Sequence, residues 1–364
     1  MLRIPLLAAL LLLIGPVSLE GQGLPLGQRG FYLRIGGLPA ESGLALGLGF
    51  RKTGLADNLV DLQAELIGSA KLYEQAEIQL QLPRLYSERL FVHLAVRYRN
   101  FPEENFWGLG PDTQPRRETN FRLEDVDYQA TLGFRPWRTL QLGALGGFHQ
   151  SNSGLGQDGC CPSTEEIFKA TEVPALDEQP HHAYGGAFTQ FDTRDSTSNP
   201  RSGFYSRFRW TTYHDLNLSR FSFHQYDVQL EQFIPIREKR GTFALRGMTS
   251  LTDVTHGQQV PFFLQATAGG SRDLRGFRQS RFRDQNNLIF NLEFRWALNG
   301  FLDSILFADA GKVFSHPGDF RFNQLEGSVG LGSRLKLEER VFLGFDVGWG
   351  REGFRFRVQG GHTF

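Results

Sequence analysis

The residues best suited to specific chemistry form a glycine-rich segment that presents one arginine and one aromatic side chain. Its members are Gly269, Gly270, Leu274, Arg275, Gly276 and Phe277. A guanidinium can bind a carboxylate through two parallel hydrogen bonds, and Gly276 would let the segment turn tightly. Taken alone, such a segment is more often a mobile surface loop than a binding element.

The sequence lacks the common signatures of catalysis. No Gly-x-Ser-x-Gly or His-Glu-x-x-His pattern occurs, so nothing indicates a hydrolase nucleophile or a zinc peptidase. The pair His181-His182 is interpreted as a solvated loop pair rather than a metal site. Asp192 and Asp195 flank Arg194, and this cluster is interpreted as stabilising a turn, with a catalytic dyad as the less favoured alternative. We therefore expect no enzyme activity, no cofactor and no metal.

The elements that must position the glycine-rich segment are predicted to be β-strands. Between residues 288 and 298 the even positions are apolar, whereas the odd positions are mostly polar and include Glu293 and Arg295. A similar alternation occurs over residues 60–66 and 341–350. A period of two is the pattern of a half-buried strand.

Two features indicate that the apolar strand faces meet lipid. These faces are dense in Phe, Leu and Trp, while the opposite faces carry charged pairs such as Glu293 with Arg295, which suits a wet lumen. The connections also alternate between short links and long ones, the long ones covering residues 101–119, 151–181 and 253–285. Short periplasmic turns and long external loops are typical of outer-membrane barrels.

The composition agrees with a membrane sheet and argues against other classes of protein. The chain has 33 Phe and 42 Gly but only 2 Met, which is unusual for a helical enzyme. Its 39 basic side chains balance its 39 acidic ones, and this neutrality argues against nucleic-acid binding. No stretch after the N-terminus reaches the roughly 20 apolar residues that a membrane helix needs.

These patterns together predict an all-β fold, a 16-stranded antiparallel transmembrane β-barrel. The strands are expected near residues 29–36, 42–51, 58–69, 72–83, 88–99, 120–134, 138–150, 182–193, 202–214, 220–235, 240–252, 286–298, 303–313, 325–337, 340–350 and 354–364. An even number of strands places both ends of the barrel on the periplasmic side and every long connection outside.

The N-terminus is interpreted as a secretory signal. Arg3 precedes an apolar run over residues 4–14, which Pro16 interrupts before small residues follow. The run is too short to span a bilayer as a mature helix. We therefore expect a signal peptide over residues 1–23, with an approximate end, and the barrel over residues 24–364 in the cell outer membrane.

Several ordered motifs resemble those of the bacterial surface antigen barrels of the BamA/TamA superfamily, which includes the two-partner secretion transporters. Leu274-Arg275-Gly276-Phe277, after its glycine pair, is similar to the family hallmark in the sixth external loop. Phe307-Ala308-Asp309-Ala310-Gly311 resembles the family motif on the thirteenth strand. Residues 191–205 and 106–111 are also similar to family motifs. The resemblance covers roughly residues 30–364.

The resemblance implies a site inside the lumen. It makes the sixth external loop fold inward, with Arg275 at its tip paired to Asp309. Glu293 is a second candidate partner, because the alternation of its own strand places it on the inward face. By alternation, Phe307 and Gly311 lie on the same strand face as Asp309, so that Gly311 would leave room for the tip.

The resemblance also makes the last strand a seam that pairs weakly with the first. Phe356 and Val358 are expected to face lipid, while Gly360 and Gly361 interrupt the strand and permit a bend. Phe364 is the expected C-terminal signal for barrel assembly. A lateral gate toward lipid and an ordinary closing strand with a flexible end are equal alternatives here.

The function that the resemblance implies is protein insertion or translocation, in outer-membrane protein assembly or secretion. Family members usually carry periplasmic POTRA modules, whereas only a few residues separate the expected signal from the first strand. We therefore expect the barrel to act without its own periplasmic modules. Its expected partners are outer-membrane lipid, client proteins or a separate periplasmic protein. The alternative is a passive channel or a structural surface barrel with a loop plug.

Overall fold

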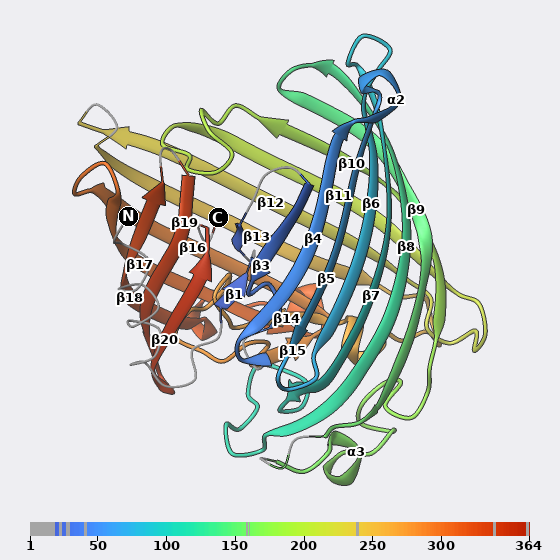
Figure 1. The fold of residues 1–364 in the computed structure, drawn as a ribbon. Helices are drawn as coiled ribbons and strands as arrows, with labels where there is room; N and C mark the ends of the chain where they lie inside the picture. Colours follow the sequence, from blue (N-terminus) through green and yellow to red (C-terminus); the bar gives the residue numbers. More distant parts are fainter. Residues whose placement is uncertain are drawn as a thin grey trace.

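The computed structural model describes residues 19–21, 24–26, 30–39, 42–157, 159, 161–237, 240–337, 340–361 and 364. Its main feature is one sheet of 18 strands, curved into a barrel-like wall (Figure 1). Two of these strands, β1 (Leu19–Gly21) and β2 (Leu24–Leu26), are only 3 residues long. The other 16 strands are longer and follow one another in chain order.

The long strands form an antiparallel meander in which each strand pairs with the next. They are β3 (Gly30–Ile35), β4 (Ala45–Gly54), β5 (Val60–Ser69), β6 (Glu74–Leu85), β7 (Leu90–Phe106), β8 (Thr119–Trp137), β9 (Leu140–Leu155), β10 (His181–Asp192), β11 (Gly203–Asp215), β12 (Phe223–Ile236), β13 (Gly241–Asp253), β16 (Asn286–Ala297), β17 (Leu302–Phe314), β18 (Glu326–Leu337), β19 (Arg340–Gly350) and β20 (Gly353–Gly360). The predicted fold class, number of long strands and strand order are confirmed.

The remaining elements are short and lie in the connections. They are the helices α2 (Leu55–Asn58) and α3 (Thr164–Ile167), the 3₁₀ turns η2 (Phe262–Leu264), η3 (Pro317–Asp319) and η4 (Phe322–Gln324), and the paired strands β14 (Ala266–Ala268) and β15 (Phe282–Asp284). Within the described residues, no helix is long and apolar enough to cross a bilayer.

Side chains on the long strands alternate between an apolar outer face and a polar inner face. On β16, Leu292 is 42% exposed, whereas its neighbour Glu293 is fully buried. On β17, Leu306 is half exposed, while Asp309 faces inward and is buried. A membrane barrel requires an apolar band outside and charged groups inside. The period-two pattern of the sequence therefore marks these two strand faces, as predicted.

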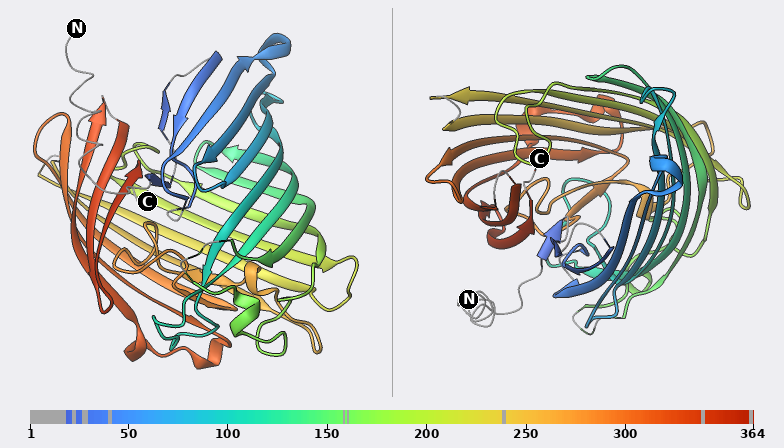
Figure 2. Two further views of the ribbon diagram at one scale, coloured as in Figure 1. Left: turned by 60° about the horizontal axis from the view of Figure 1, so that its bottom comes forward. Right: turned by 45° about the horizontal axis from the view of Figure 1, so that its top comes forward.

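The two ends of the meander do not pair directly in the described part of the chain. Instead, β1 runs parallel to β20, and β2 runs antiparallel to β3. The blue and red ends of the sheet face each other in Figure 2. β1 falls inside the predicted signal range, residues 1–23, and the rest of that range lies outside the described residues. The boundary of the signal peptide therefore stays a prediction.

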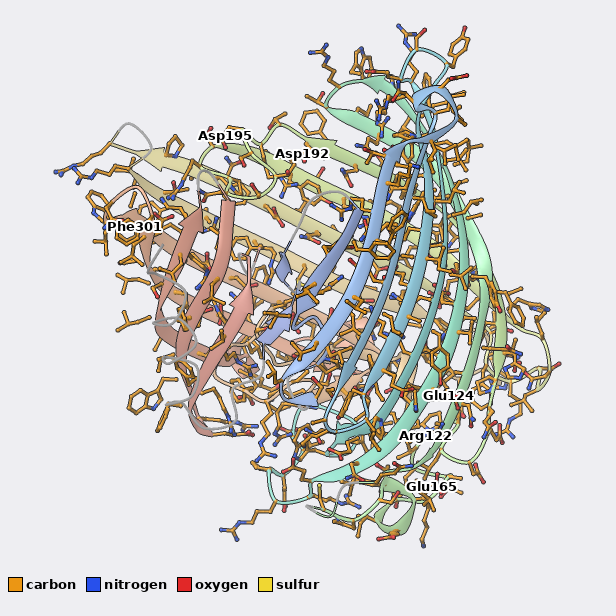
Figure 3. The ribbon with its side chains drawn as sticks, viewed as in Figure 1. Arg122, Glu124, Glu165, Asp192, Asp195 and Phe301 are labelled. Carbon is orange, nitrogen blue, oxygen red and sulfur yellow. The ribbon has the colours of Figure 1, made fainter. Side chains whose placement is uncertain are left out.

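The connections separate the two ends of the barrel. Asp192, Asp195 and Phe301 lie toward one end, and Arg122, Glu124 and Glu165 lie toward the other, as Figure 3 shows. The first end carries the short turns and is the periplasmic end by the even-strand argument. One connection departs from the expectation that every long link lies outside, because residues 193–202, which join β10 to β11, lie at the periplasmic end.

Two neighbouring positions on β8 test which strand face meets lipid. Leu132 is 56% exposed on the outer face, and Thr131 lies on the inner face. We expect L132R to lower the free energy of unfolding by about 2–4 kcal/mol, because an arginine in the hydrocarbon region is costly. T131R is the matched control and should change stability little. Urea titration of the protein in liposomes, read by unheated gel mobility, measures both; equal effects would contradict this assignment of faces.

Candidate functional site

The glycine-rich segment lies in loop 6, defined here as residues 254–285 between β13 and β16. Loop 6 folds into the barrel, where its strands β14 and β15 lie against the inner wall (Figure 1). Leu274 and Phe277 are fully buried and pack in an apolar cluster with residues of β15, β16 and β17. Burial of these apolar side chains thus stabilises the loop in its position inside the lumen.

The entry to the tip needs glycine. Gly269 and Gly270 have φ of 116° and 123°, a region that side chains with a Cβ rarely adopt. A Cβ added at Gly269 would also lie 2.4 Å from the main-chain oxygen of Arg278. The backbone conformation of the loop therefore requires glycine at both positions.

Arg275 is fully buried and is bound by the carboxylate of Asp309 on β17. The guanidinium donates from Nε to Oδ2 at 3.0 Å and from Nη2 to Oδ1 at 2.7 Å, which is the two-point geometry expected for such a pair. The main-chain N–H of Arg275 also donates to Oδ2, at 3.0 Å. The structure thus brings the predicted partners together.

The second candidate partner also contacts Arg275. Nη1 donates to Glu293 Oε1 at 2.5 Å, and the guanidinium lies over the ring of Phe307, 3.5 Å from its centroid. Burial alone would lower the pKa of Arg275, but the carboxylates of Asp309 and Glu293 raise it above its ordinary value. Two carboxylates and one aromatic face therefore hold the arginine in its charged form.

Further polar residues fix the two carboxylates, and of these the sequence singled out only Arg295, as the charged partner of Glu293. Asn291 donates from Nδ2 to Asp309 Oδ1 at 2.7 Å, and Ser328 donates from Oγ to Asp309 Oδ2 at 3.1 Å. Arg295 donates from Nε to Glu293 Oε2 at 2.8 Å. Asn291 and Arg295 sit on the polar face of β16 beside Glu293, so the alternation of that strand was the available signal.

The glycines at the tip serve a role other than the predicted one. Gly276 does not have a positive φ, and a Cβ on it would lie 2.6 Å from the main-chain nitrogen of Gly350. A Cβ on Gly348 would lie 2.6 Å from the carbonyl of Arg275. Close approach between the tip and β19 therefore demands these glycines. At Gly311 the atoms nearest to an added Cβ belong to Leu288 and Ile289 of β16, and Ile289 in turn packs with Leu274 and Phe277 of the tip.

The predicted seam residues divide between two environments. Phe356 is exposed on the outer face, whereas Val358, two residues later on the same face of β20, is only 3% exposed, at the point where β1 runs beside β20. Gly360 is the last residue of β20 and Gly361 has a φ of 80°, which redirects the chain. Phe364 lies inside, where its main-chain oxygen accepts a hydrogen bond from Arg295 at 2.8 Å.

The acidic cluster and the histidine pair noted in the sequence have structural roles, in a turn and in the barrel wall. Asp192 accepts hydrogen bonds from the guanidinium of Arg194, and Asp195 accepts from the main chain of Arg201 and Ser202. His182 is fully buried, not solvated, and its Nε2 shares a hydrogen bond with the main-chain oxygen of Phe221 at 2.9 Å. Among the described residues, no group of His, Cys, Asp and Glu is arranged to hold a metal ion.

Comparison with known proteins assigns this geometry to a family. The model of the Omp85 superfamily domain matches residues 62–364, which include loop 6, Asp309 and the seam strand. The chain belongs to the Omp85 superfamily. Omp85 proteins are outer-membrane β-barrels, so this chain is an outer-membrane barrel of the type that its motifs resemble. A comparison with curated proteins finds no match to the sequence.

Solved structures with a similar fold include other barrels of this kind. BamA from Haemophilus ducreyi, lacking POTRA domains 1–3, aligns with a TM-score of 0.65 and 14% identity, over 92% of this chain and 68% of that chain. CdiB from Acinetobacter baumannii aligns with a TM-score of 0.55 and 12% identity, over 92% and 57%. CdiB from Escherichia coli gives 0.56 and 10%, over 92% and 60%, so this Omp85 chain spans less than two thirds of either CdiB.

Charge reversal tests whether the ion pair holds the tip. R275E would place three carboxylates together in a buried site, and removing one partner of a buried pair already costs about 3–5 kcal/mol. We expect R275E to lose at least that much stability and to expose loop 6 to trypsin.

The matched control for R275E is R272E, because Arg272 lies at the same tip with an exposed side chain. Urea midpoints and trypsin cleavage within loop 6 report on both variants. A wild-type midpoint together with an uncleaved loop in R275E would show that the pair does not hold the tip.

Proposed function

We propose that this Omp85 barrel inserts or translocates client proteins at the outer membrane, in outer-membrane protein assembly or secretion. The observation that carries the proposal is that β3 and β20 do not pair with each other in the described part of the chain, combined with folded segments that enter the lumen from both ends. The proposal involves binding and conformational change and no catalysed reaction.

The external end of the lumen is covered by packed loops. We call the following set of buried residues the external cap: Phe106, Phe121, Phe168, Val173, Ala175, Leu176, Phe221, Phe262 and Phe263. Several of its rings meet edge to face, as Phe121 and Phe262 do at 4.7 Å between centroids. Arg281 of loop 6 donates to Glu352 at 2.9 Å and to Thr113 at 2.7 Å, which ties the loop to its neighbours.

The periplasmic end carries a second inward segment, residues 193–202 between β10 and β11. Arg201 of this segment forms an ion pair with buried Asp303 of β17, and Asp303 also contacts Lys336 at 2.6 Å. Arg194 reaches Glu231 of β12 at 3.0 Å. What remains between this segment and the loop 6 tip is a polar cavity of about 480 Å³. Ion pairs thus anchor folded segments at both ends of the lumen.

The seam is the part of the wall with the fewest strand contacts. In the described residues, β20 pairs along its length with β19 and on its other edge with the three residues of β1. A strand edge with open hydrogen-bonding groups accepts an added strand from another chain. Pairing of a client at the seam, after delivery by a separate periplasmic partner, would leave the segments that fold into the lumen in place.

Client folding in vesicles tests the proposal directly. The purified protein would be reconstituted in liposomes, and an unfolded outer-membrane barrel would be added from urea. We expect the client to reach its protease-resistant folded form faster than in empty liposomes, because the seam offers a template for its strands. R275E should lose the effect, whereas R272E should keep it. Client folding no faster than in empty liposomes would refute an insertion role.

The alternative function is a passive channel with a loop plug, and conductance distinguishes it. A passive channel conducts as the native protein in a planar bilayer. The proposed function predicts little steady conductance from the native chain and a large increase when residues 269–283 are deleted, because that deletion removes the tip and its ion pairs. A steady native conductance that the deletion leaves unchanged would favour the passive channel.

A further inference from the structure

The loop 6 tip crosses the part of the wall that leads to the seam. Arg275 reaches Glu293 on β16 and Asp309 on β17, as described above. The next contacts continue in the same direction, because Gly276 lies close to Ser328 of β18 and to Gly350 of β19. The tip therefore lies on the inner surface of consecutive strands and ends at β20.

The contact with β20 is made by Arg357. Its side chain is buried, and its guanidinium donates from Nε to the main-chain oxygen of Arg275 at 3.3 Å. Nη2 of Arg357 donates to the main-chain oxygen of Phe277. One planar guanidinium thus holds two carbonyls on either side of Gly276, an arrangement that a lysine ammonium cannot reproduce with the same geometry.

The nearest carboxylate on the neighbouring strand, that of Asp346, binds other side chains and not Arg357. Asp346 is its register partner on β19. Asp346 accepts hydrogen bonds from Arg334 at 2.7 and 3.0 Å and from Gln359 at 3.1 Å. Arg357 instead spans from the seam strand to the tip. This contact joins two parts of the molecule that are 80 and 82 residues apart in sequence.

We propose that Arg357 is a positioning residue that couples the seam strand to the plug, so that loop 6 acts as an inner clasp for β20. On its outer edge β20 pairs with the three residues of β1 within the described residues, and the tip adds a contact from inside the barrel. Release of the tip then loosens β20, and displacement of β20 loosens the tip. This inference rests on the contacts of the chain alone and does not require that the barrel handle client proteins.

Hydrogen exchange measured by mass spectrometry on the full chain in nanodiscs tests the coupling. We expect R357Q to raise the exchange rate about tenfold both in β20 and in residues 272–279, because hydrogen bonds from a charged donor are lost. β12, on another part of the wall, should exchange at the wild-type rate. R357K should give an intermediate increase in both segments.

The matched control is R355Q, which changes an arginine two positions earlier on the same face of β20. Arg355 is part-buried, and within the described residues no hydrogen bond joins it to the tip. We expect R355Q to leave the exchange of residues 272–279 unchanged. An R357Q variant whose β20 and tip keep wild-type protection, or whose entire barrel exchanges faster by one common factor, would overturn the proposal.

A second variant keeps the test valid if R357Q folds poorly. G348A leaves Arg357 intact but places a methyl group 2.6 Å from the carbonyl of Arg275, which pushes the tip away from β19. We expect it to raise exchange in β20 as well as in the tip. Because both changes would break one coupled contact, the double variant G348A/R357Q should exchange no faster than the faster single variant. Fully additive effects would contradict a shared clasp.

Discussion

A charged guanidinium inside a barrel needs carboxylates that cannot move away, and Arg275 takes them from two adjacent strands. Glu293 and Asp309 reach the lumen only because β16 and β17 keep their register. A slip of one residue on either strand would turn its carboxylate toward lipid and bring an apolar side chain inside. The ion pair and the strand register therefore stabilise each other, and the position of loop 6 depends on both.

The fold could be predicted because membrane strands show their two faces in the sequence. The alternation around Glu293 and Arg295 marked β16, and similar runs marked the other long strands. The partners of Arg275 could be named because a short motif contained Asp309 and the alternation of β16 placed Glu293 inside. Both inferences use patterns that span only a few residues, either an alternation of apolar and polar residues or a short motif.

Features that depend on contacts between distant segments could not be predicted in this way. No local pattern shows that Gly348 on β19 makes room for the carbonyl of Arg275, or that Val358 lies beside β1. The inward course of residues 193–202 follows from an ion pair with Asp303, about 100 residues later in the chain.

The order of segments along the chain has a consequence for how this barrel forms. Loop 6 follows β13, whose Arg246 donates to the main-chain oxygen of Arg272, but it precedes all the other strands that its tip touches, from β16 to β20. During folding, the tip can reach its final position only after the last strand has arrived, since Arg357 belongs to β20. Contacts of such long range form late, because the intervening chain must first be ordered. The loop 6 tip therefore reaches its place in the lumen in the same step in which the last strand completes the wall. A barrel that still lacks β20 also lacks a fixed plug.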